Sequence, residues 1–317
     1  MASATFSALI PDLICVEQRG LASAIFGVMN LVGAGAGYIL NGIILPLQKT
    51  SLSYPVTALL VTIFTVITLL AARETPLDPT VKLPKLGLKL GLVKMFGALK
   101  HRNFALVCIA RVLYFMSLSP QAFLFFLISD ISNSSNPTRD VSILSISAIV
   151  MSMVVAIPAG KLSDRIGRKI FVYATTVLFI AVYEGLLFSK SIILIWVLGG
   201  VFGAAQGCYW TVDMALAVDC FPADETTPDG DGKGEGAEAG ANMGIWGVSQ
   251  GVGLLVGTYC AGPILQAVGS TSESNHYTRT GYAVIFSMGS LYCLLASVAI
   301  FLIRTKPKNG TSIAQIN

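Results

Sequence analysis

Eight stretches of apolar residues in this chain are each long enough to cross a lipid bilayer as a helix. A helix rises 1.5 Å per residue, so about 20 apolar residues cover the roughly 30 Å hydrocarbon core. The stretches run approximately over residues 20–45, 54–73, 104–129, 142–160, 170–189, 191–219, 241–268 and 281–304. Charged residues make up only 12% of the chain, about half of the share in soluble domains. The sequence therefore predicts an all-α, multi-pass integral membrane protein.

Lysine and arginine are unevenly distributed among the connections between these stretches. If the connection over residues 73–103 lies in the cytoplasm and the spans alternate, 16 of the 21 basic residues fall on the cytoplasmic side and four on the other. The remaining one, Arg111, lies within a span. Cytoplasmic loops of membrane proteins carry an excess of positive charge. We therefore expect the central connection and the C-terminus to be cytoplasmic.

Several kinds of site are not indicated. The six cysteines are scattered without a Cys-x-x-Cys pair, and the two histidines, His101 and His276, lie far apart. This pattern predicts neither a disulfide framework nor a metal site. The glycine-rich residues 33–37 lie within an apolar span, without the preceding strand that a nucleotide-binding loop needs. With no Ser/His/Asp constellation and a net charge of +4, we expect no enzymatic activity, no cofactor and no nucleic-acid partner.

Two blocks of sequence occur twice, in the same order. Ala-Leu-Ile-Pro-Asp at residues 8–12 corresponds to Ala-Leu-Ala-Val-Asp at 215–219. The second block repeats at a constant offset, pairing Gly27, Asn30, Gly33 and Gly37 with Gly247, Gln250, Gly253 and Gly257. Internal repeats of this kind are typical of transporters built from related helical halves. The short apolar run before Pro11 then matches the end of the fourth helix of a six-helix half.

A short polar connection joins two of the spans. It has the sequence Gly160-Lys161-Leu162-Ser163-Asp164-Arg165-Ile166-Gly167-Arg168-Lys169. Gly160 permits close helix approach and Gly167 a tight turn, while Asp164 can accept hydrogen bonds at the start of the next helix. The cationic side chains can pair with acidic groups or helix C-termini. The segment resembles the cytoplasmic signature G-x-L-[AS]-D-R-x-G-R-[RK] of the major facilitator superfamily at nearly every defined position.

This resemblance covers the whole chain and implies its organisation. It implies a remnant of an N-terminal half at 1–73 (the end of helix four, then helices five and six), a cytoplasmic central loop at 74–103, a complete six-helix half at 104–304 and a cytoplasmic tail at 305–317. The first three helices would then be missing. The resemblance also implies that the segment 160–169 latches a conformational gate. The segment 203–216, with Asp219 and Pro222, looks like the sugar–cation symporters of the sucrose and glycoside–pentoside type.

Three ionisable residues, Arg111, Glu184 and Asp213, lie within the predicted spans. A charge at the centre of a membrane helix costs a few kcal/mol, so such residues are usually functional. Arg111 and Asp213 lie at similar depth, about 12 Å and about 9 Å from the predicted cytoplasmic side. They could face each other, either as a solute-binding or proton-coupling pair or as a structural pair that fixes helix packing. The alternative is that both side chains extend to the membrane surface. Glu184 lies near the outer end of its span and is expected to reach the membrane surface.

Helical spacing also predicts two polar and aromatic stripes. One carries Arg111, Tyr114, Leu118, Gln121 and Phe125, and the other carries Gln206, Trp210, Asp213 and Ala217. Such stripes suit a sugar-like ligand whose ring stacks on Trp210. The candidate solute and coupling residues are therefore Arg111, Gln121, Gln206, Trp210 and Asp213. Asn30 and Gln250 lie on glycine-lined faces, for which helix packing is the favoured interpretation.

These features predict a secondary active transporter for a small polar organic solute. A sugar is the expected solute, with proton coupling if Asp213 titrates, and the mechanism is rocking of two helical halves about a midplane site. The expected partners are this solute, protons and the lipid bilayer. The alternative is a non-transporting membrane protein with a structural or partner-binding role, which the absence of three helices would favour.

Overall fold

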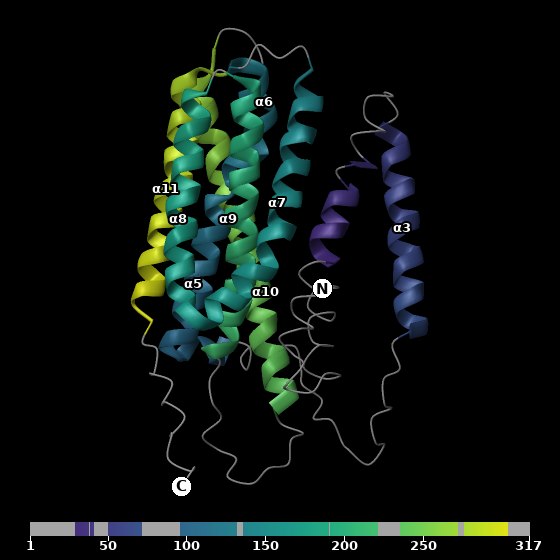
Figure 1. Cartoon of the computed structure of the whole chain (residues 1–317), viewed down its shortest axis with the longest axis vertical. Coiled ribbons are helices and arrows are strands. Elements are labelled where there is room, and N and C mark those ends of the chain that lie inside the picture. Colours follow the sequence, from purple (N-terminus) through teal and green to yellow (C-terminus); the bar gives the residue numbers. More distant parts are fainter. Residues whose placement is uncertain are drawn as a thin grey trace.

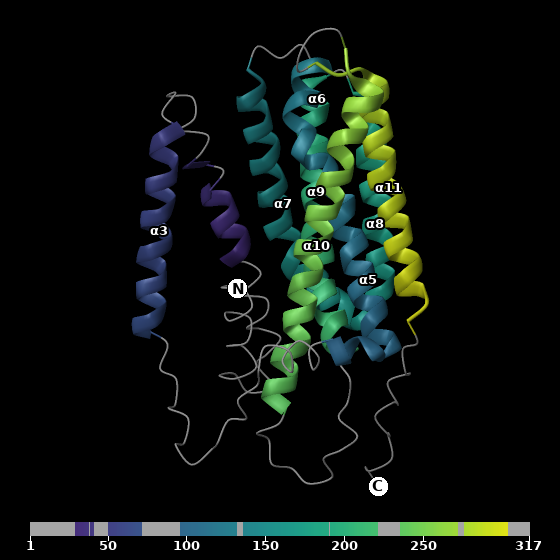
Figure 2. The same cartoon turned by 180° about the vertical axis from the view of Figure 1, so that it is seen from behind.

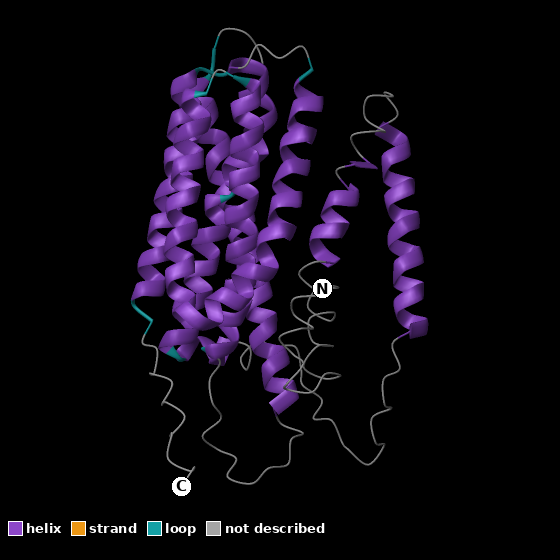
Figure 3. Ribbon diagram, viewed as in Figure 1, coloured by secondary structure: helices purple, strands orange, loops and turns teal. Residues whose placement is uncertain are grey.

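The computed structural model describes residues 29–37, 39–40, 50–71, 96–131, 136–189, 191–220, 235–271 and 276–303, and these are almost entirely helical (Figure 3). The α-helices are α3 (Thr50–Ala71), α5 (Arg102–Ser117), α6 (Leu124–Ile131), α7 (Pro137–Ile166), α8 (Arg168–Phe188), α9 (Ile192–Asp219), α10 (Glu235–Gly269) and α11 (Arg279–Phe301). Two 3-10 helices, η3 (Ala98–Lys100) and η4 (Ser119–Phe123), flank α5. The described residues contain no strand, only a single bridge between Ser270 and Tyr277. The all-α fold class is confirmed.

Seven helical segments of the described chain are long and apolar enough to cross a membrane. They coincide with seven of the eight predicted spans, although α7 and α10 extend beyond the predicted 142–160 and 241–268. The eighth predicted span, 20–45, is described only at residues 29–37 and 39–40, which are helical. The short run before Pro11, most of the predicted central loop and the tail from residue 305 lie outside the described residues.

The six spans that follow residue 100 form one bundle (Figures 1 and 2). In it α7 packs along α9, α10 packs along α5, and α11 packs against both α5 and α8. The bundle is thus built from two sets of three spans that are packed alike. The second span of the first set (α7) packs on the first span of the second set (α9), and the second span of the second set (α10) packs on the first span of the first set (α5). Such nested three-plus-three repeats occur within six-helix transporter halves. Helix α3 stands apart from the bundle, and none of its apolar span is buried.

Consecutive helices of the bundle run in alternate directions (Figure 1). The end of α7, the start of α8, the end of α9 and the start of α10 lie at one end of the bundle, called here the α7–α8 end. The end of α6, the start of α7, the end of α8, the start of α9, the end of α10 and the start of α11 lie at the other, called the α8–α9 end. Every span therefore runs from one end of the bundle to the other.

Glycines bring α9 close to α7. A Cβ atom at Gly203 would lie closer than 3.0 Å to the backbone of Ala148, and one at Gly207 would meet the backbone of Ser152 in the same way. The Ser152 hydroxyl donates a hydrogen bond of 2.5 Å to the carbonyl of Gly203. Lipid offers little hydrophobic driving force for helix association, so small residues and hydrogen bonds stabilise such contacts.

The predicted span 104–129 is not one continuous helix. Helix α5 ends at Ser117, the 3-10 helix η4 follows with Pro120 in its first turn, and α6 begins at Leu124. Proline lacks the N–H that an α-helix needs and clashes with the preceding turn. The predicted stripe therefore does not extend to Phe125: Arg111, Tyr114 and Leu118 are buried, whereas Phe125 is 43% exposed.

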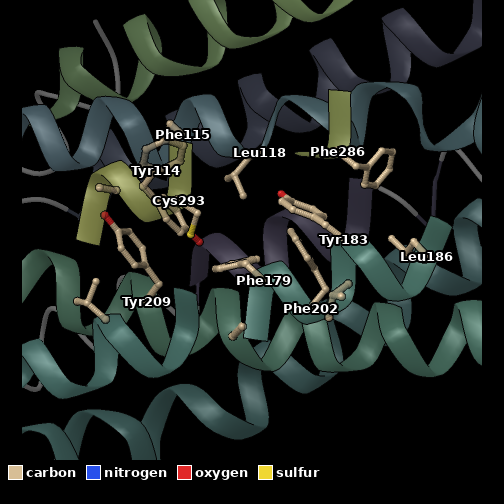
Figure 4. Close-up of a cluster of buried hydrophobic side chains, with 14 of the residues drawn as sticks. Tyr114, Phe115, Leu118, Phe179, Tyr183, Leu186, Phe202, Tyr209, Phe286 and Cys293 are labelled. Atoms are coloured by element: carbon tan, nitrogen blue, oxygen red, sulfur yellow. The ribbon is translucent and has the colours of Figure 1, made fainter. Parts of the chain in front are cut away.

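Aromatic side chains fill the centre of the bundle (Figure 4). The rings of Tyr114 and Tyr209 stack with centroids 3.3 Å apart, and Phe179 meets both Tyr114 and Phe202 edge-on. The buried Tyr183 donates its hydroxyl hydrogen to the backbone carbonyl of Ser117, just before the break. This core fixes α5, α8 and α9 around the region where the buried charges lie.

Candidate functional site

The two buried charges predicted to face each other are in contact. Arg111 lies in α5 and Asp213 in α9, each only 4% exposed. The Arg111 Nη1 atom forms an ion pair with Asp213 Oδ2. Together with the stacked rings of Tyr114 and Tyr209, this ion pair links the two helices directly.

Helix α10 supplies two further partners to Arg111. The Arg111 Nη2 atom donates a hydrogen bond of 2.9 Å to Gln250 Oε1. The guanidinium carbon lies 3.4 Å from the ring centroid of Trp246 and 4.9 Å from that of Phe115. A cation over an aromatic face is stabilised by the ring quadrupole, and more so away from water. Arg111 is thus held by a carboxylate, an amide oxygen and two rings.

One face of α10 explains how these partners reach Arg111. Trp246, Gln250, Gly253 and Gly257 follow one another at helical spacings of four, three and four residues. A Cβ atom at Gly253 or Gly257 would lie closer than 3.0 Å to the backbone of α5, at Val112 or Met116. These glycines therefore let α10 approach α5, which places the polar end of the same face against Arg111.

Sequence reasoning assigned Gln250 to helix packing and did not single out Trp246. The packing interpretation holds for the glycines but is incomplete for Gln250, whose side chain contacts the buried charge. The sequence signal for both residues was their position on the helix face that carries Gly253 and Gly257. Gln250 lies about one turn before Gly253, and Trp246 lies two turns before it.

Asp213 has its own neighbours in α9 and α5. The Tyr209 hydroxyl, one helical turn earlier, donates a long hydrogen bond of 3.5 Å to Asp213 Oδ1. The Tyr209 ring is stacked on Tyr114 of α5, as Figure 4 shows. Both tyrosines are buried, so the carboxylate sits at the polar edge of the aromatic core.

The other candidate solute residues do not bond to this pair. Gln121 lies in η4, beyond the break in its span, and Gln206 and Trp210 lie earlier in α9, each partly buried. Within the described chain, no hydrogen bond joins any of the three to Arg111 or Asp213. The Gln121 Nε2 and Trp210 Nε1 atoms are buried without a partner. Their role in binding stays a prediction.

The segment 160–169 forms the tight turn at the α7–α8 end. Gly167 separates the two helices with a φ of 111°, a conformation that side chains with a Cβ rarely adopt. A Cβ atom at Gly160 would lie 3.0 Å from the Thr211 side chain of α9. Both glycines therefore occupy positions with the geometric demands that the sequence indicated.

Two cationic side chains of this turn contact the ends of other helices. Arg168 donates to the carbonyl of Ala215 in the last turns of α9, and Lys169 donates to the carbonyl of Ile303, just beyond the end of α11. The carbonyl end of a helix carries a partial negative charge and attracts cations. The backbone of Asp164 lies in α7 but its side chain is outside the described structure, and Arg165 is exposed.

Comparison with known proteins gives the context of this arrangement. The sequence model of the Major Facilitator Superfamily matches residues 112–316, more than half of the chain. The chain is also 29% identical over 184 residues to the uncharacterized protein YqgE of Bacillus subtilis (strain 168). That alignment covers 56% of this chain and 37% of YqgE, so the chain spans little more than a third of the relative. The bundle, its short glycine turn and the family match together place this chain in the major facilitator superfamily.

Proposed function

We propose that this protein takes part in secondary active transport of a small polar organic solute by alternating access. Family membership and the multi-pass helical bundle support this function. The observation that carries it is the buried ion pair between Arg111 and Asp213. Ionisable residues inside membrane helices are costly and mark solute pathways, ion pathways and proton relays.

Stability alone gives little reason for this pair. Replacing a buried ion pair by apolar residues of similar size is often neutral or stabilising, because desolvation of two charges offsets their attraction. The pair lies beside Trp246 and Gln250, which are only partly buried. We infer that the pair binds the solute or exchanges a proton while the bundle moves.

The finer prediction is a sugar taken up together with protons. Residues 203–216 support the sugar, since they look like the sugar–cation symporters, and Asp213 is the residue whose protonation would couple the two. In the same proposal the α7–α8 end faces the cytoplasm. Arg168 and Lys169 would latch the ends of α9 and α11 there in one conformation and release them in the other.

Transport is tested with the purified chain in proteoliposomes carrying a pH gradient. Uptake of radiolabelled glucose, sucrose and a xyloside is measured against empty liposomes. We expect a gradient of one pH unit to drive up to about tenfold accumulation of one of them, since one pH unit is worth about 1.4 kcal/mol per proton. Flux equal to that of empty liposomes for all three sugars would reject them as solutes, and the same result for radiolabelled glucuronate would favour the non-transporting alternative.

The coupling role is tested in the same assay with Asp213→Asn. We expect this variant to lose accumulation against a gradient while it still exchanges labelled for unlabelled solute. Glu184→Gln is the matched control, since it also neutralises a carboxylate within a span, but at a site in α8 remote from the pair. Accumulation by Asp213→Asn at the native level would reject coupling through this residue.

A further inference from the structure

Some of the buried polar atoms around Arg111 have hydrogen-bond partners and others have none. Among the described residues, the Arg111 Nε, Trp246 Nε1 and Tyr114 Oη atoms are buried without a hydrogen-bond partner. Two of these can only donate, and the tyrosine hydroxyl can donate or accept. Tyr114 lies one turn after Arg111 in α5, and the ring of Trp246 faces the guanidinium. The cluster therefore has several donors with nothing to bond.

The acceptors of the same cluster are engaged by Arg111 and Tyr209. Asp213 Oδ1 accepts from Tyr209, and Gln250 Oε1 accepts from Arg111 Nη2. Asp213 Oδ2 forms the ion pair with Arg111 Nη1 and accepts no hydrogen bond from the described residues. A buried donor left without a partner is destabilising, because it has lost its hydrogen bonds to water and gained none in the protein. A bound group that supplies acceptors and no donors would remove this cost. A carboxylate has that property, since it is acceptor-only and can receive two parallel bonds from arginine.

The charges of the cluster restrict the ligand further. The native pair is neutral as a whole, so adding a carboxylate alone would leave one uncompensated negative charge in the membrane interior. If Asp213 binds one proton as the solute enters, the guanidinium pairs with the solute carboxylate and the net charge stays at zero. A neutral hydroxyl brings a donor with each acceptor, and a cationic solute would be repelled by Arg111.

We propose that this site binds its solute through a carboxylate group, which replaces Asp213 as the partner of Arg111 when Asp213 takes up one proton. The inference rests on the proposed transport function and narrows its solute to carboxylate-bearing molecules, among which sugar acids keep the expected sugar-like body. Trp246 and Gln250 hold the guanidinium while its counter-ion changes. Tyr114 and Trp246 supply further donors to the incoming carboxylate.

The groups that titrate near Asp213 are few. Arg111, Cys108 and Tyr114 of α5, Tyr209 of α9 and Cys293 of α11 are within electrostatic range of the pair or of its tyrosine partner. Helix α10 contributes the uncharged Trp246 and Gln250. Of these groups only Asp213 has an ordinary pKa in the acid range. A pH response of ligand binding that Asp213→Asn abolishes therefore reports on this carboxylate.

The test is equilibrium binding to the purified chain, measured by calorimetry at pH 5.5 and pH 7.5. The probes are three matched pairs, each a carboxylate and its neutral alcohol analogue: glucuronate and glucose, lactate and propane-1,2-diol, benzoate and benzyl alcohol. We expect at least one carboxylate to bind at least about tenfold more tightly than its neutral partner at pH 5.5. Its affinity should fall at pH 7.5, approaching tenfold per pH unit where Asp213 is mostly ionised. No preference in any pair would overturn the proposal.

Three variants separate this proposal from non-specific binding. Asp213→Asn should keep the carboxylate preference and lose its pH dependence, since it leaves Arg111 without a competing anion. Trp246→Phe keeps the ring over Arg111 but removes the donor, so it should weaken carboxylate binding severalfold. The double variant Arg111→Gln/Asp213→Asn keeps the site neutral in case Arg111→Gln alone does not fold, and it should lose the preference. A preference that persists in the double variant, or an unchanged pH dependence in Asp213→Asn, overturns the proposal.

Binding and transport can fail independently. Glucose flux without any carboxylate preference would reject this inference and leave the transport function in place. Carboxylate binding with the expected pH dependence, in a chain that moves no solute across the liposome membrane, would support the site and reject transport.

Discussion

The charges of Arg111 and Asp213 compensate each other, because each residue is the counter-ion of the other. Both are buried, and their ion pair joins α5 to α9. Removing one partner from a buried pair leaves a charge in a medium that solvates it poorly. We expect Arg111→Gln and Asp213→Asn each to lower the free energy of unfolding by about 3–5 kcal/mol, and the double variant to lose less than their sum. Unfolding in mixed micelles with increasing sodium dodecyl sulfate measures this cycle, and additive losses would show that the two residues are not coupled.

The sequence was sufficient to predict the contact between these two residues but not its surroundings. Charges within apolar stretches are rare, and the rise per residue gives their depth, so two opposite charges at similar depth could be paired. Trp246 and Gln250 are uncharged, so their position within a span did not mark them as functional residues. Their contact with Arg111 depends on how closely the glycines let α10 approach α5, which is a property of the packed bundle.

At the scale of elements, the close contact of α9 with α7 depends on Gly203. A methyl group there would overlap the backbone of Ala148, which cannot move without displacing α7. We expect Gly203→Ala to lower the free energy of unfolding by about 1–3 kcal/mol. Gly200→Ala is the matched control, since its Cβ would lie 3.4 Å from the flexible Met151 side chain. Equal thermal-unfolding midpoints for the two variants in detergent would contradict this account of the interface.

A second link joins α6 to the start of α11 at the α8–α9 end. Asp130, whose side chain is 6% exposed, accepts hydrogen bonds from the Tyr282 hydroxyl at 2.6 Å and the Tyr277 backbone N–H at 2.9 Å, and its other oxygen lies 2.7 Å from His276 Nδ1. A hydrogen bond to a charged group contributes about 1.5–3 kcal/mol. We expect Tyr282→Phe to lose stability in that range.

The matched control for this link is Tyr277→Phe. It removes a tyrosine hydroxyl from the same region but leaves the backbone N–H that Asp130 accepts. Chemical unfolding of both variants, followed by tryptophan fluorescence, gives the comparison. A loss in Tyr277→Phe as large as in Tyr282→Phe would mean that the hydroxyl bond of Tyr282 contributes nothing specific.

The break between α5 and α6 shows a limit of hydropathy at this scale. Three of the bundle's spans contain proline: Pro120 lies at the break, whereas Pro158 and Pro263 lie inside the continuous helices α7 and α10. Membrane helices tolerate proline where neighbouring groups satisfy the freed backbone. Whether a given proline ends the helix therefore depends on its packed surroundings, which the sequence does not reveal locally.

For the whole molecule, the fold class and seven of the eight predicted spans followed from hydropathy because lipid leaves few alternatives. A spanning segment must satisfy its backbone internally, so each apolar stretch of sufficient length becomes a helix. The arrangement of those helices does not follow from hydropathy. It follows from small residues such as Gly203 and Gly253, whose partners on α7 and α5 are distant in sequence.

The orientation of the whole bundle can be tested with two engineered cysteines. The basic residues predict that the α7–α8 end, with the exposed Arg165, faces the cytoplasm, and that Ser270 at the α8–α9 end faces outward. In intact bacterial cells that express the chain, a membrane-impermeant maleimide should label Ser270→Cys and spare Arg165→Cys until the membrane is permeabilised. The parent chain provides the background, since its own Cys260 is exposed. The reverse pattern would contradict the prediction and place the cationic turn outside. Labelling of both variants in intact cells would mean that the chain inserts in both orientations. That result would contradict the proposal that Arg168 and Lys169 form a latch on the cytoplasmic side.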